Sequence, residues 1–185
     1  MLYPNFSPFP EIKTARLLLR RMIAGDAKEL LYLRSSENVM KYIDRERTKT
    51  ISDAELFIDK IDAALDSNNG IMWGITLKER PRTLIGNIGY WRLVREHYRA
   101  EVGYMLHPAF WKKGIMKEAL LRVIDFGFNE MKLHSIEANV NPHNTASAKL
   151  LESTGFVKEA YFKEDYFFNG AFHDTIIYSL LKQRK

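Results

Sequence analysis

Residues 101–119, EVGYMLHPAFWKKGIMKEA, bring together residue types suited to binding phosphate. A strand-like run ends just before Pro108, which cannot continue a β-ladder because it has no backbone N–H. Lys112, Lys113 and Gly114 then lead into an amphipathic helix. A helix start presents unpaired N–H groups and the positive end of the helix dipole, to which the lysines add charge. The segment predicts a phosphate site, against the alternative of an ordinary helix start with solvated lysines.

A second strand-to-helix junction lies at residues 140–144, VNPHN, and carries amide side chains instead of cations. Asn144 suits the N-cap position, and Ser147 falls in the first helical turn. Capping alone explains Asn144, and Ser147 can satisfy a local backbone group. Two such junctions can also form one groove, in which the first holds phosphates and the second hydrogen-bonds an amide-bearing arm. Coenzyme A has both parts.

Length and composition indicate one globular domain over residues 1–185, with 46% apolar and 28% charged residues. The absence of cysteine excludes disulfides, thiolate zinc sites and a cysteine nucleophile. No histidine pattern has metal-ligand spacing, so we expect no metal. The first ten residues hold three prolines and no basic residue, unlike a signal peptide. No apolar run approaches the ~20 residues that span a bilayer. We expect a cytoplasmic protein that does not enter the membrane.

The net charge of +5 slightly favours anionic partners, either nucleic acid or a phosphorylated cofactor. The basic residues are dispersed along the chain, and we find no zinc-finger, helix-turn-helix or aromatic RNA-binding signature. We therefore expect no nucleic-acid partner.

The predicted helices and strands, which must position these two junctions, indicate a mixed α/β (α+β) domain. Two capping boxes, Asp26 with Glu29 and Ser52 with Glu55, predict helix starts. Three consecutive strands with short turns predict an antiparallel meander, and Asn169-Gly170 predicts a hairpin. The expected strands cover 15–22, 72–78, 84–93, 99–107, 134–141, 156–168 and 171–181, and the expected helices cover 27–34, 54–65, 113–131 and 145–154.

Six motifs follow one another along the chain: TARLLLR at 14–20, IGNIG at 85–89, EVGY at 101–104, PxxWxxG at 108–114, NxxSxxLLExxGF at 144–156 and NG at 169–170. In this order and spacing they resemble the GNAT-superfamily N-acetyltransferases, in the branch of the ribosomal-protein N-terminal (Rim-type) and spermidine acetyltransferases. The resemblance implies a mixed, mostly antiparallel sheet of six to seven strands. That sheet would be splayed at its fourth strand, with helices on both faces and an irregular arm over residues 1–12.

The resemblance also implies a site for acetyl-coenzyme A (acetyl-CoA). Backbone groups of Tyr104, Met105 and Leu106 would run along the pantetheine and thioester, and a free N–H would stabilise the oxyanion. Asn144 would bind the pantetheine arm. In the family's loop pattern the outer positions are Gln or Arg and Gly or Ala, whereas this chain has Trp111 and a Met that would crowd the loop. The pyrophosphate would lie against Lys112, Lys113, Gly114, Ile115, Met116 and Lys117.

The reaction implied is direct attack of a primary amine on acetyl-CoA in a ternary complex. Many relatives protonate the leaving thiolate with a tyrosine where this chain has Leu151, so Ser147 is the candidate acid. Some relatives place a catalytic glutamate where this chain has Asn139, which can orient an amine but cannot deprotonate it.

Glu101, on the strand that would face the thioester, is the candidate base. Its alternative role is a structural carboxylate paired with Arg99 or Arg16.

The sequence does not identify the amine that accepts the acetyl group. A protein N-terminus is the first interpretation, and a polyamine or another small amine is the second. An inactive CoA-binding regulator and a nucleic-acid-binding module are the alternatives from other classes. The sequence is compatible with a monomer or a homodimer.

Overall fold

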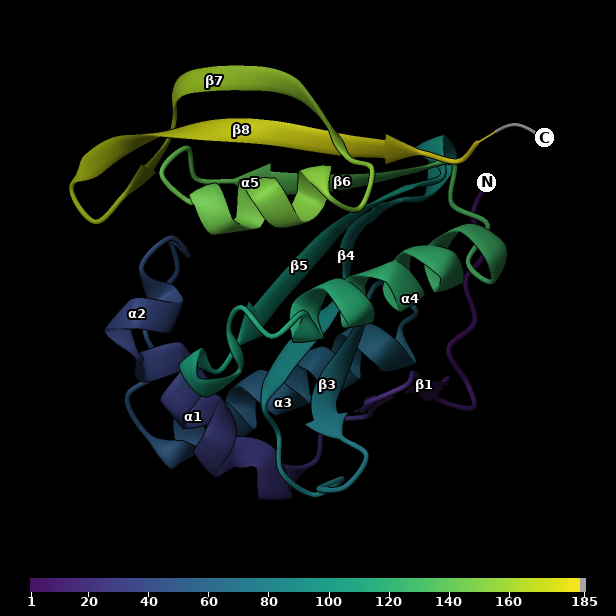
Figure 1. Cartoon of the computed structure of the whole chain (residues 1–185), viewed down its shortest axis with the longest axis vertical. Coiled ribbons are helices and arrows are strands. Elements are labelled where there is room, and N and C mark those ends of the chain that lie inside the picture. The colour runs from purple at the N-terminus through teal and green to yellow at the C-terminus, as the bar shows by residue number, and fades with distance from the viewer. Residues whose placement is uncertain (184–185) are drawn as a thin grey trace.

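The computed structural model describes residues 1–183 and contains one eight-stranded sheet with helices on both faces (Figure 1). The strand order is β1-β2-β3-β4-β5-β6-β8-β7, and every neighbouring pair is antiparallel except β5 and β6. The predicted mixed class is confirmed, but the expected count of six to seven strands is too low. The additional strand is β1, a two-residue pairing that has no periodicity to reveal it.

The elements largely follow the predicted spans. The strands are β1 Ile12–Lys13, β2 Leu17–Arg20, β3 Ile71–Leu77, β4 Gly86–Val94, β5 Arg99–Leu106, β6 Ser135–Val140, β7 Val157–Phe168 and β8 Ala171–Leu181. The α-helices are α1 Ala27–Ser35, α2 Glu37–Met40, α3 Ile51–Asp66, α4 Ile115–Asn129 and α5 Thr145–Glu152. Three single 3-10 turns lie at Ala24–Asp26, Arg95–His97 and Pro108–Phe110.

The sheet splits between β5 and β6. The two strands pair in parallel only from Arg99 opposite Ser135 to Glu101 opposite Glu137. Beyond that point β6 stays paired with β8, and β5 stays paired with β4. The strands therefore diverge into a V whose closed end lies at Glu101, as Figure 1 shows for β5 and β6.

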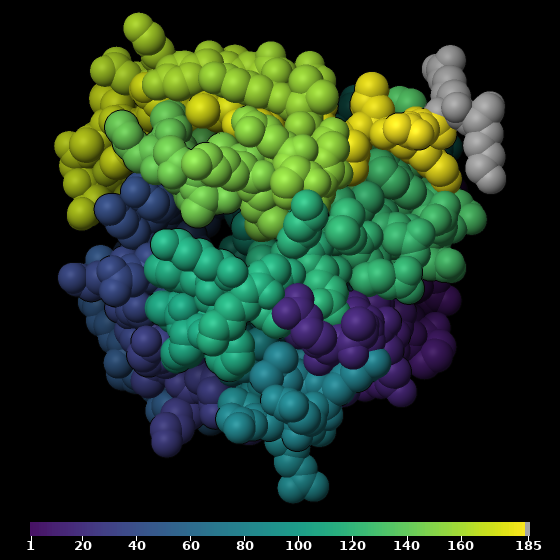
Figure 2. All heavy atoms as spheres, viewed as in Figure 1, coloured from purple at the N-terminus to yellow at the C-terminus, as the bar shows by residue number. Residues whose placement is uncertain are grey.

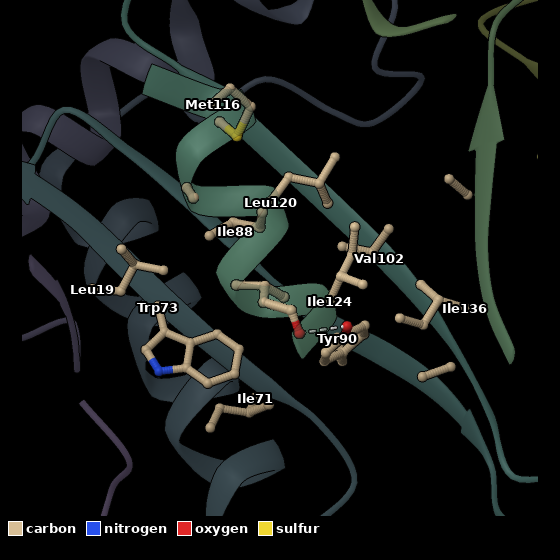
Figure 3. Close-up of a cluster of buried hydrophobic side chains, with 14 of the residues drawn as sticks. Leu19, Ile71, Trp73, Ile88, Tyr90, Val102, Met116, Leu120, Ile124 and Ile136 are labelled. Atoms are coloured by element: carbon tan, nitrogen blue, oxygen red, sulfur yellow. Dashed lines mark hydrogen bonds between the residues drawn. The ribbon is translucent and has the colours of Figure 1, made fainter. Parts of the chain in front are cut away.

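The two faces of the sheet have separate cores. The larger core lies under α4 and includes the fully buried Trp73 and Tyr90, whose hydroxyl donates to the Val123 carbonyl at 2.8 Å (Figure 3). Met116 also packs into this core and is 8% exposed. The expectation was that Met116 would crowd the phosphate loop, whereas its side chain is packed among the core residues. The smaller core lies under α1, α2 and α3 and includes Met105 at its border.

Both expected capping boxes are wrong. Helix α3 begins two residues earlier than the Ser52 pattern implies: Thr50 accepts from the Asp53 N–H at 3.1 Å, and the Asp53 carboxylate accepts from the Thr50 N–H at 2.9 Å. Both patterns fit the capping rule, and the earlier one satisfies the true first turn. At α1, Asp26 does not cap the helix with its side chain. Its buried carboxylate instead binds Arg20 at 2.7 Å.

We expect Thr50→Ala to lower the free energy of unfolding by about 1 kcal/mol, the usual cost of losing an N-cap hydroxyl. Chemical denaturation with an unchanged m-value would measure it. Ser52→Ala is the matched control, since Ser52 lies inside the helix and makes no cap, and it should leave stability nearly unchanged. Equal losses in both variants would contradict this assignment.

Candidate functional site

The open side of β5 presents backbone donors to the V-shaped gap. The His107 N–H donates to the Ile85 carbonyl at 2.8 Å, so it points toward β4. Because successive N–H groups of a strand point to opposite edges, those of Leu106 and Tyr104 point into the gap and that of Met105 toward β4. Two of the three residues expected along a thioester thus direct an N–H into the gap.

The loop between β5 and α4 is held in a conformation suited to an anion. Lys112 and Gly114 have left-handed backbones, with φ of 58° and 73°. The Trp111 indole donates to the Leu106 carbonyl at 2.7 Å and so anchors the loop to the end of β5. Turns of this kind, placed before the free N–H groups of a helix start, form anion-binding concavities.

The side chains of this loop divide by direction. Lys112, Lys113 and Lys117 are exposed, whereas Ile115 and Met116 are buried in the core. The last two residues can therefore offer an anion only their backbone N–H groups. The lysines can supply mobile positive charge around it.

Arg16 supports this loop from the N-terminal side. Its guanidinium donates to the Lys113 carbonyl at 2.9 Å and pairs with Glu118 at 2.7 Å. Partial burial alone would raise the pKa of Glu118, but hydrogen bonds from Thr14 and Arg16 lower it below its usual value. Arg16 therefore supports the loop between β5 and α4 and does not pair with Glu101.

A pair of hydroxyl groups bridges the gap from β5 to α5. Tyr104 and Ser147 share a hydrogen bond of 2.7 Å between their oxygens. Burial raises the pKa of Tyr104 to about 12, so the phenol stays protonated at neutral pH. Asn144 caps α5 by accepting from the Ser147 N–H at 3.1 Å, which fixes the hydroxyl's position. The capping role considered for Asn144 is thus present, and it uses the side-chain oxygen and not the amide nitrogen.

Glu101 lies at the closed end of the V and is 7% exposed. Its carboxylate is 3.2 Å from Arg92, while Arg99 lies 3.6 Å from Glu137. The expected structural partners, Arg99 and Arg16, are therefore wrong. Burial is the main cause that raises the pKa of Glu101, and Glu137 adds to it, whereas Arg92 and Arg45 oppose the rise.

Arg92 reaches Glu101 through an irregularity in β4. The register between β4 and β5 shifts between Trp91 and Val94, and Arg92 adopts a left-handed backbone with φ of 47°. Bulges re-aim side chains and occur often beside active sites. The sequence pattern gives no sign of this bulge, so the sequence analysis does not identify Arg92 as the partner of Glu101.

The loop between α2 and α3 approaches the same face of the sheet. Asp44 accepts a hydrogen bond from the Tyr166 hydroxyl on β7, and burial together with that carboxylate raises the pKa of Tyr166. Arg45 lies over the Trp91 ring at 5.4 Å. In the space-filling view the surface is hollowed at the open end of the V, between α2 (blue), α5 (light green) and the segment before α4 (teal) (Figure 2).

Two further properties of residues 1–183 bear on the site. No cluster of three or more His, Asp or Glu side chains in this part of the chain could hold a metal ion. None of its helices combines the length and apolar character needed to cross a membrane.

Leu151, where many relatives carry tyrosine, is fully buried in the core. Ser147 and Tyr104 are thus the hydroxyls that meet across the gap.

Comparison with known proteins agrees with this geometry. A family model described as an acetyltransferase (GNAT) domain matches residues 16–157. The uncharacterised N-acetyltransferase YoaA of Bacillus subtilis (strain 168) is 35% identical over 177 residues, which cover 96% of this chain and 99% of that protein.

Two solved structures share the fold and represent the two expected branches. The ribosomal-protein-S5-alanine acetyltransferase of Vibrio fischeri has a TM-score of 0.80 and 25% identity, over 93% of this chain and 96% of that one. The spermidine N-acetyltransferase of Vibrio cholerae, solved with CoA and spermine, has a TM-score of 0.79 and 25% identity, over 91% and 96%. The chain therefore belongs to the GNAT family of acetyltransferases, which transfer the acetyl group of acetyl-CoA to an amine.

Proposed function

We propose that this chain acetylates the α-amino group of a peptide or protein N-terminus by direct attack on acetyl-CoA. The observation that carries the proposal is the V between β5 and β6, with free N–H groups along its β5 side and a buried carboxylate at its closed end. The N–H groups of Tyr104 and Leu106 would stabilise the developing oxyanion, and Glu101 would accept the proton of the amine.

The residues around the V fit acetyl-CoA. The left-handed backbone at Lys112 and Gly114 and the free N–H groups of the α4 start would hold the pyrophosphate. The amide of Asn144 would bind the pantetheine arm. The cofactor supplies an activated thioester whose thiolate leaves easily, because thiols have reference pKa values near 8.5. Ser147, which the protonated Tyr104 can resupply, would give that thiolate its proton.

The charges on the acceptor side favour an α-amine over a polyamine. Glu101 and Glu137 are each paired with an arginine, Asp44 accepts a hydrogen bond from Tyr166, and Arg45 lies over Trp91. A polyamine carries several charges at neutral pH and would meet these cations. An α-amine, with a reference pKa near 8, carries at most one charge and loses it easily.

A thiol-release assay with acetyl-CoA tests the proposal. A peptide with a free N-terminus should release CoA, while the same peptide with a blocked N-terminus and an internal lysine should release little. A higher kcat/KM for spermidine or an aminoglycoside than for every peptide would overturn the α-amine proposal. Binding of acetyl-CoA by calorimetry, without thiol release for any of these amines, would favour a CoA-binding regulator. Salt-sensitive binding of nucleic acid without CoA affinity would favour a nucleic-acid-binding module.

A further inference from the structure

Asn139 carries a buried oxygen that the described part of the chain leaves without a hydrogen-bond partner. Such a group costs stability unless a water molecule or a ligand satisfies it. Asn139 follows Glu137 by two residues on β6, so both side chains lie on the same face of the sheet. The β5 residue at the same level is Gly103, two residues beyond Glu101, where the strands have begun to part.

Gly103 carries no side chain at this level of β5, and the Trp91 indole lies against it. A Cβ built at Gly103 would lie 3.4 Å from the Trp91 indole nitrogen, and the two next nearest atoms also belong to the indole. The cross-strand neighbour on β4 is Gly89, which also lacks a side chain. The floor is therefore backbone, with the indole edge of Trp91 on one side and β6, carrying Asn139, on the other.

The Trp91 indole is held in place yet keeps its donor. The guanidinium groups of Arg45 and Arg92 lie 5.4 Å and 5.5 Å from its ring centre. The indoles of Trp73 and Trp111 each donate to a backbone carbonyl oxygen at 2.7 Å. The Trp91 N–H makes no such bond within residues 1–183, and its nitrogen is the atom nearest to a Cβ built at Gly103.

We propose that Asn139 and Trp91 together recognise an α-amino amide, the group at every peptide N-terminus; this rests on the function proposed above. Asn139 Oδ1 would accept from the N–H of the attacking amine, and the Trp91 N–H would donate to the carbonyl oxygen one carbon away. An uncharged amide oxygen suits the neutral amine that attacks the thioester. A polyamine offers the donor but has no carbonyl for Trp91, so the pair selects peptides.

The test compares two acceptors of similar shape, alanine amide and isopropylamine, which differ in the carbonyl group. Asn139→Leu should raise KM about tenfold for both, the effect of one hydrogen bond. Trp91→Phe should raise KM about tenfold for alanine amide and leave that for isopropylamine within twofold. In both variants kcat should change less than KM. An equal effect of Trp91→Phe on the two amines, or an unchanged KM in Asn139→Leu, would overturn the proposal.

Three further variants separate recognition from folding. Asn139→Asp keeps an acceptor oxygen and should keep KM within about threefold of the wild type. Gly103→Ala adds one methyl group against the Trp91 indole, at the level of Asn139, and should raise KM for both amines. Asn129→Leu makes the same exchange on α4, where the side chain contacts Asp125, and should change neither KM.

A binding measurement distinguishes failure of this proposal from failure of the proposed function. Calorimetry should show trialanine amide binding to the CoA-loaded chain, with Kd raised about tenfold in Asn139→Leu and Trp91→Phe. If the wild type turns over no amine but these shifts appear, the proposed activity fails and the recognition site stands. If peptides are acetylated and both variants bind trialanine amide as the wild type does, the recognition site fails alone.

Discussion

Replacing Glu101 with Gln is expected to lower kcat/KM for a peptide amine about 100-fold or more at pH 7, within the usual range for losing a general base. An α-amine with a pKa near 8 is mostly protonated at that pH, so its proton must go to a base. Burial and the neighbouring Glu137 raise the pKa of Glu101 above the usual 4.5, which makes its carboxylate a stronger base. An amide at this position cannot accept the proton.

The pH dependence of the rate tests whether Glu101 is the base. Glu101 acts when deprotonated, so the wild-type rate should fall as the pH drops through its raised pKa, and Glu101→Gln should lose that acid limb. The loss should shrink at high pH, where free amine is abundant. Arg92→Met removes a charge that lowers this pKa and should move the limb to higher pH, whereas Glu137→Gln should move it to lower pH. An unchanged pH–rate profile in Glu101→Gln would rule out the base.

Local sequence signals were sufficient where the structure is itself local. The two strand-to-helix junctions at Gly114 and Asn144 lie where Pro108 and Pro142 end their strands, and the Asn169-Gly170 hairpin forms as expected. These features depend on backbone constraints of a few adjacent residues. The family's motifs then gave the fold and the cofactor, because their order specifies how the junctions assemble.

The sequence does not predict which residues, far apart along the chain, contact one another in the fold. Glu101 was recognised as a candidate, but its partner is set by a β-bulge that rotates Arg92 out of the strand pattern. The burial of Met116 depends on which face of α4 meets the sheet. Asn139 was visible as an amide where some relatives have glutamate. That its oxygen is buried without a partner among residues 1–183 depends on the strands that surround it.

Replacing Gly114 with Val is expected to weaken CoA binding about 100-fold, measured as Kd by calorimetry. Gly114 has φ of 73°, a conformation that β-branched residues strongly avoid, so the loop must change shape. The N–H groups at the start of α4 then lose their common direction. Hydrogen bonds to a charged group contribute about 1.5–3 kcal/mol each, so losing one or two accounts for about two powers of ten.

A substitution at a second glycine with a left-handed backbone distinguishes the loss of CoA binding from general backbone strain. Gly170 has φ of 83° at the β7–β8 turn, and a Cβ there would meet no atom within 4 Å. Gly170→Val should therefore lower stability and leave the Kd for CoA unchanged. Acetyl-pantetheine lacks the pyrophosphate, so its kcat/KM should fall far less than that of acetyl-CoA in Gly114→Val. Equal losses for the two thioesters would place the damage at the thioester end of the V, and the anion role of the loop would then be wrong.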